Sequence, residues 1–148
     1  MSDEQSRYRG PLTTRWDYMK EILVECPKCN KEALVTVDTK FHNRGKLTCR
    51  NCMHSERSVD RSRKYKSSGH AVDPIFGLPL WFQAEVRGDL FWASNREHLG
   101  EIKSYVSAKL RERQTMLFTT MVEKLPHFIK DAKNRATIIK AIEKLERK

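Results

Sequence analysis

The stretch that decides the fold is a pair of matching brackets, Cys26-Pro27-Lys28-Cys29 and Cys49-Arg50-Asn51-Cys52, and the 148-residue chain has no other cysteine. Together they have the spacing C-x2-C-x19-C-x2-C, which is typical of structural zinc sites. A gap of two residues lets both thiolates of one tight turn face the same ion, and two such turns complete a tetrahedral shell. We therefore predict one structural Zn2+, with no open position for water or substrate, bound by Cys26, Cys29, Cys49 and Cys52.

Other uses of the four cysteines fit less well. Two disulfides would require an oxidising compartment, and residues 1–7 have no apolar stretch, so we expect no signal peptide and a cytoplasmic location. A thioredoxin-like redox motif needs a single CxxC beside a βαβ pattern, which this chain lacks. Iron in the same four-sulfur cage is the main alternative metal. His54 or His42 could replace a thiolate, but with four cysteines available we expect both to be spectators.

The chain carries a strong and unevenly distributed positive charge. Its formal net charge is +10, and residues 40–70 alone hold 9 basic and 2 acidic side chains. Such an excess favours a polyanionic partner, and nucleic acid is the commonest one in a cytoplasmic protein. No apolar run approaches the length of a membrane span, so we expect no membrane partner.

The apolar pattern predicts an α+β protein. An N-terminal zinc ribbon, built on a short antiparallel sheet, is followed by a β-hairpin and a helical C-terminal part. So short a sheet buries too little apolar surface to be stable without its metal. The expected parts are a disordered or loosely attached tail at 1–15, the ribbon at 16–60, a basic linker at 61–72, and the hairpin with three or four helices at 73–148.

Short motifs predict local details of the second half. Gly88-Asp89 fits a two-residue type II′ turn, which places Val86 opposite Phe91 in the hairpin. Ser94, with Glu97 three residues later, predicts a capping box at the start of a helix. That helix is expected to end near Arg113, and further helices are expected at 115–125, from Pro126, and after a cap at Asn134.

The ribbon half, residues 22–60, resembles the zinc ribbons of general transcription factors and of many small bacterial proteins through its two brackets. A glycine usually follows the second cysteine of such a knuckle because the turn needs a positive φ. Asn30 tolerates that conformation, whereas Met53 is less comfortable in it.

The whole chain resembles a group of small bacterial zinc-ribbon proteins of no established activity. This resemblance implies a fold and a zinc site but no function. It rests on Asp73-Pro74-Ile75-Phe76-Gly77-Leu78-Pro79-Leu80-Trp81, on Leu90-Phe91-Trp92-Ala93-Ser94-Asn95, and on Leu125-Pro126-His127-Phe128.

Two functions follow as hypotheses. The first is a module that binds DNA or RNA, with Tyr65, Trp81 or Trp92 as possible stacking groups, although we expect both tryptophans in the core. Its phosphate contacts would come from Arg44, Lys46, Arg50, Arg57, Arg61, Arg63, Lys64 and Lys66. The second is a protein–protein adaptor that docks on a larger transcription or replication machine without touching nucleic acid.

Catalysis is not expected. The sequence has no P-loop, GxSxG or HExxH motif, and the predicted metal shell is closed. His70 and Asp73 are close in sequence, but a loop histidine beside an aspartate is usually solvated. We expect His98 and His127 to be surface or helix-capping groups. The sequence therefore predicts a binding protein without a small-molecule substrate.

Overall fold

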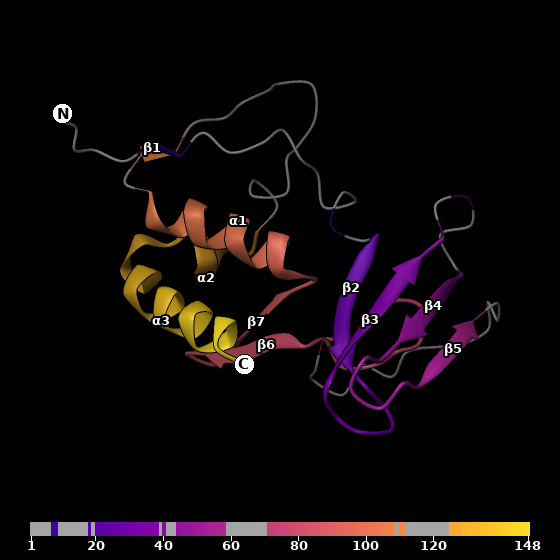
Figure 1. Ribbon diagram of the computed structural model, residues 1–148. Helices are drawn as coiled ribbons and strands as arrows, with labels where there is room; N and C mark the ends of the chain where they lie inside the picture. The colour runs from indigo at the N-terminus through magenta and orange to yellow at the C-terminus, as the bar shows by residue number, and fades with distance from the viewer. Residues whose placement is uncertain are drawn as a thin grey trace.

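A computed structural model describes residues 7–8, 18, 20–38, 40, 44–58, 71–108, 110–111 and 125–148. A four-stranded antiparallel sheet lies on one side of the molecule, and a β-hairpin with helices lies on the other (Figure 1). The predicted α+β class, with the ribbon first and the helices last, is confirmed.

The ribbon sheet has four antiparallel strands in the order β2-β3-β4-β5. The loops that carry the cysteine brackets join β2 to β3 and β4 to β5, and both leave the sheet at its lower end in Figure 1. Adjacent strands in sequence are neighbours in space because each connection is short. The bounds are β2 Glu21–Glu25, β3 Glu32–Val37, β4 Gly45–Thr48 and β5 Ser55–Ser58.

One face of this sheet packs against residues 71–80, which begin within the segment expected to be a linker, 61–72. The carboxylate of Asp73 organises that stretch by accepting hydrogen bonds from the backbone N–H groups of Ile75, Phe76 and Leu78 at 2.7–2.8 Å. The resulting loop adds side chains to the ribbon core, whose buried members include Ile22, Val24, Val35, Leu47, Ile75, Phe76 and Leu80. The predicted division of the chain therefore does not separate the packed cores, because residues 73–80 belong to the ribbon core.

The free edge of β2 is covered by the chain around the hairpin. The N–H of Leu23 donates to the carbonyl of Ser94 at 2.8 Å, and the N–H of Trp81 donates to the carbonyl of Leu23 at 2.9 Å. The N–H of Glu25 donates to the carbonyl of Pro79 at 2.9 Å. Backbone hydrogen bonds thus attach the ribbon directly to the second half of the molecule.

The hairpin pairs β6 (Phe82–Val86) with β7 (Asp89–Ala93) in a register that differs from our prediction. Val86 lies opposite Asp89, and Phe91 lies opposite Ala84. The turn is Arg87-Gly88, with φ angles of 52° and 86°. Positive φ at both central residues indicates a type I′ turn, whose twist matches that of the strands. The prediction that Gly88-Asp89 forms the turn was wrong. Arg87 occupies the first central position of the turn, although a positive φ is unfavourable for most side chains.

Two helices cover the hairpin. Helix α1 (Arg96–Ser107) packs against β7, and α3 (Arg135–Glu146) packs against β6. A short helix, α2 (His127–Lys130), and a 3-10 turn, η3 (Ala132–Asn134), precede α3. Beyond α1, β8 (Leu110–Arg111) pairs in parallel with β1 (Arg7–Tyr8). The core of this half includes Phe82, Phe91, Leu99, Ile102, Val106, Ile138 and Ile142.

The start of α1 also differs from the prediction. Asn95 is the N-cap, and its side-chain oxygen accepts a hydrogen bond from the N–H of His98 at 2.9 Å. Ser94 is buried, and its N–H donates to Nδ1 of His98 at 3.0 Å. His98 is itself buried and stacks on Tyr18 with ring centroids 4.9 Å apart, so it is not a surface residue.

The other helical predictions have mixed outcomes. Helix α1 ends at Ser107 and not near Arg113, and the helix expected over residues 115–125 falls largely outside the described residues. The short helix after Pro126 and the helix after Asn134 are confirmed. Trp81 is buried as predicted, whereas Trp92 is half-buried at the margin of the ribbon core.

Candidate metal centre

The four cysteines converge on one point. Their Sγ atoms all lie within 4.8 Å of one another, with 3.6 Å between Cys26 and Cys52 and 3.6 Å between Cys29 and Cys49. A tetrahedral zinc with sulfurs at about 2.3 Å requires sulfur–sulfur separations of about 3.8 Å. The donor set is therefore of the right kind and spacing to hold one Zn2+ ion.

The backbone of each knuckle presents its two cysteines in the same way. In the first knuckle the N–H of Asn30 donates to the carbonyl of Cys26 at 2.9 Å, and the N–H of Lys28 approaches the Cys26 sulfur at 3.4 Å. Asn30 and Met53 follow the last cysteines of the two knuckles, with φ angles of 61° and 64°. Met53 thus adopts the left-handed conformation at a position where glycine or asparagine is more usual, and its side chain extends into solvent.

The crowded thiols shift one another's pKa values. Hydrogen bonds from the side chain of Asn51 and the backbone of Lys31 lower the pKa of Cys29 to about 6. For Cys52 the backbone N–H of His54 acts in the same direction, but desolvation and the three neighbouring thiols raise its pKa to about 12. Four adjacent thiols therefore do not all ionise by themselves, whereas a bound divalent cation deprotonates its thiol ligands.

His54 is not part of the cluster. Nε2 of His54 lies 2.7 Å from a carboxylate oxygen of Glu56, which turns the ring toward the sheet. His42 lies outside the described residues. Within the part of the chain that the structure describes, the metal-binding group consists of the four cysteines. Cys26 and Cys49 are fully buried, Cys29 is partly buried and Cys52 is exposed, so the centre lies at the edge of the ribbon core.

The structure places four of the eight predicted phosphate-binding residues. Lys46 and Arg57 lie directly opposite each other on β4 and β5, and both are exposed. Arg50 is exposed in the second knuckle. Arg44 is half-buried and already interacts with another group of the protein. Four further residues lie outside the described residues, and their role stays a prediction: Arg61, Arg63, Lys64 and Lys66.

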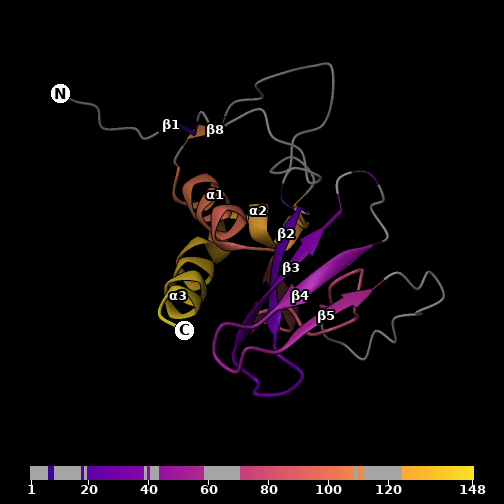
Figure 2. The ribbon, with the colours of Figure 1, turned by 45° about the vertical axis from the view of Figure 1, so that its right-hand side comes forward.

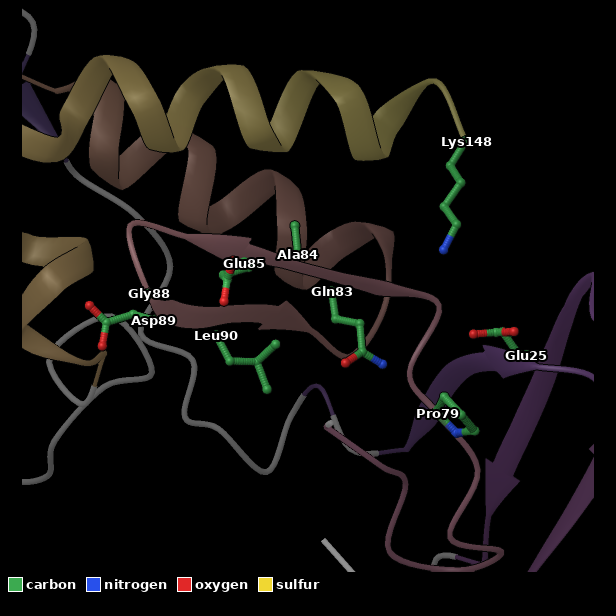
Figure 3. Close-up of a pocket in the computed structure, with 9 residues that line it drawn as sticks. All are labelled: Glu25, Pro79, Gln83, Ala84, Glu85, Gly88, Asp89, Leu90 and Lys148. Carbon is green, nitrogen blue, oxygen red and sulfur yellow. The ribbon is translucent and has the colours of Figure 1, made fainter. Parts of the chain in front are cut away.

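A second feature, a hollow of about 550 Å3, runs along the open side of the hairpin (Figure 3). Carboxylates of Glu25, Glu85 and Asp89 line it, and Gln83 and Glu85 point into it from β6. Its lysine, Lys148, is engaged elsewhere, because Nζ donates to the carbonyl of Trp81 at 2.7 Å. An acidic lining repels polyanions, so this hollow does not belong to a phosphate-binding surface.

Comparison with known proteins adds no assignment to this geometry. No described helix combines the length and apolar character that a membrane crossing requires.

The opposition of Lys46 and Arg57 was not predicted from the sequence, because it depends on strand register and leaves no motif. No family model, curated protein or solved structure matches the chain, so the candidate zinc centre rests on the four cysteines and their convergence.

Proposed function

We propose that this protein is a non-catalytic zinc-ribbon protein that binds nucleic acid through basic residues of the ribbon and of the segment that follows it. The observation that carries the proposal is the pairing of Lys46 with Arg57 across two neighbouring strands. Like charges directly opposite each other destabilise a sheet. Neither residue has an ion-pair partner among the described residues, so a bound anion would offset this repulsion.

In this function zinc would be structural. Bound by Cys26, Cys29, Cys49 and Cys52, it would hold the two knuckles together and thereby maintain the strands that carry the cations. Contacts from lysine and arginine to phosphates give affinity without reading base sequence. The basic residues between 61 and 66 extend the same positive charge along the chain, which supports a polyanionic ligand.

The test is binding of zinc-loaded protein to a labelled 20-nucleotide RNA and a DNA of the same sequence, measured by fluorescence anisotropy over a range of salt. We expect binding that weakens steeply with salt, because each phosphate contact lowers the log–log slope by about 0.7 for single strands. A variant with alanine at Arg61, Arg63, Lys64 and Lys66 should bind more weakly and with a flatter slope. Absence of binding even at low salt would contradict the proposal and favour the adaptor hypothesis.

A further inference from the structure

One face of the ribbon sheet is turned away from residues 71–80, and its apolar and charged side chains are segregated. Strand register aligns its side chains in two rows across the sheet. The first row runs Leu23, Leu34, Thr48, Ser55, and the second runs Glu21, Thr36, Lys46, Arg57. Figure 2 shows β3, β4 and β5 side by side, with α1 beside the β2 side of the sheet. We call this surface the outer face, and it has an apolar end at β2 and β3 and a cationic end at β4 and β5.

The apolar end packs against the core of the helical half, where Leu23 is buried and Leu34 is partly buried, and a hollow remains beside them. A cavity of about 420 Å3 lies between the sheet and the start of α1, and its lining includes Leu23 and Leu34. The charged residues of the lining are two cations and two anions, so the hollow is electrically balanced: Lys20, Arg96, Glu21 and Glu97. A volume of this order is within the range of small-molecule sites.

One wall of this hollow is held in place. The guanidinium of Arg96 donates to both carboxylate oxygens of Glu32, at 2.6 and 2.9 Å, and lies 5.4 Å from the centroid of the Phe82 ring. The opposite end of the outer face, at Arg57, is two strand spacings across the sheet and two residues along β5 from Leu34, or about 12 Å. A fixed hollow lined by charges of both signs therefore lies a short distance from an exposed pair of cations.

We propose that the outer face is the nucleic-acid-binding surface and that its ligand is single-stranded. This inference rests on the proposed function and deepens it. Phosphates contact Lys46 and Arg57, and an unpaired base or sugar enters the hollow over Leu34. An unpaired nucleotide exposes the flat faces of its base, which can cover apolar side chains. A duplex stacks its bases inside and offers this face mainly phosphates, which would leave the hollow empty.

The first experiment compares two double variants of the full chain loaded with zinc. Lys46→Gln with Arg57→Gln removes the cation pair, and Lys140→Gln with Arg147→Gln removes one lysine and one arginine from exposed positions at α3. The outer-face variant should bind a labelled single-stranded 10-mer about 25-fold more weakly at 0.1 M salt, with the salt slope reduced by about 1.4. The α3 variant has the same net charge and should bind like the wild type.

The outcomes separate the two proposals. If the wild type binds no nucleic acid, the proposed function fails. If the wild type binds but the outer-face variant binds equally well, only the assignment of the surface is overturned. The melting temperature and the far-UV circular dichroism spectrum of each variant show whether the fold is intact. The outer-face variant should keep the wild-type spectrum, and its melting temperature should not decrease, because a repulsion is removed.

The second experiment tests the unpaired base. The wild type is titrated with the 10-mer, with its duplex, and with an abasic strand of equal phosphate number. We expect the strand with bases to bind more tightly than either alternative. Equal affinity for the abasic strand or for the duplex would overturn the single-strand assignment. Polyglutamate of equal charge is the competitor. If it displaces the labelled 10-mer as effectively as the unlabelled 10-mer does, the ligand is instead an acidic polypeptide.

Discussion

The guanidinium of Arg96, at the first turn of α1, forms a two-pronged ion pair with the carboxylate of Glu32 in β3, at 2.6 and 2.9 Å. The two residues are 64 positions apart in sequence. Together with the hydrogen bonds along the edge of β2, this ion pair joins the ribbon to the helical half. The two halves therefore share an interface, and it can be probed by substitution.

The Arg96–Glu32 pair should contribute modestly to stability. Because the side chains are 58% and 35% exposed, solvent screens the pair, and we expect a coupling energy of about 0.5–1 kcal/mol. A double-mutant cycle with Arg96→Gln and Glu32→Gln, measured by urea unfolding, gives this value. Lys103 and Glu146, joined by a single hydrogen bond of 2.9 Å, serve as a comparison pair with a smaller expected coupling. A coupling energy of zero would show that the ion pair does not hold the interface.

The same pair predicts a pH dependence. The hydrogen bond from Arg96 lowers the pKa of Glu32 below its ordinary value of 4.5. A lowered carboxyl pKa adds stability that is complete at neutral pH and is lost as pH falls through the folded-state pKa. The difference in unfolding free energy between wild type and Arg96→Gln should therefore be constant near neutrality and shrink below pH 4.5. A difference that grows on acidification would contradict this assignment.

Loss of the metal should affect the two halves unequally. Cys49→Ser removes one sulfur from the centre, and we expect the ribbon to lose its fold because zinc supplies about 10–16 kcal/mol of apparent binding energy in small fingers. Helices α1 and α3 bury their own stripe around Ile102 and Ile138, so part of the helical signal in circular dichroism should persist. Complete loss of that signal would show that the halves fold as one unit.

Metal content provides a separate check. Elemental analysis of freshly purified wild-type protein should find about one zinc per chain. Less than about half an equivalent of any metal would count against the four-cysteine centre.

Met53 should be improved by glycine. Its φ of 64° is left-handed, which costs most side chains roughly 1–2 kcal/mol, and its side chain is 80% exposed, so little packing is lost. Met53→Gly should raise the unfolding free energy of the zinc-loaded protein by about 1 kcal/mol. Met53→Ala is the control and should change it little, since alanine meets the same backbone penalty. Equal stabilisation by both substitutions would show that φ is not the cause.

Removing the cation pair on the outer face should not weaken the fold. In the absence of nucleic acid, Lys46→Gln with Arg57→Gln relieves a cross-strand repulsion, and we expect a gain of about 0.2–1 kcal/mol. Differential scanning calorimetry at low salt measures the change. Added salt should reduce the gain, because screening already weakens the repulsion in the wild type. A clear loss of stability would mean that these side chains have a structural role.

The sequence by itself determined the features that depend on neighbours a few residues apart. The CxxC spacing specifies the knuckles because two thiolates on one tight turn reach the same ion, and β-branched residues specify β2 and β3. The helix after Asn134 was equally readable from its apolar stripe. These signals are local, so each one can be recognised in the sequence without knowing how the rest of the chain folds.

Tertiary structure decided the features that join distant segments. The hairpin turn moved by one residue, and the strand partner of Val86 by two, because Arg87 accepted a positive φ. His98 became a buried partner of Tyr18. The opposition of Lys46 and Arg57 and the ion pair of Arg96 with Glu32 follow from strand register and from packing of α1 on the sheet. Local propensity constrains only the backbone nearby, whereas these contacts depend on how the whole chain buries its apolar surface.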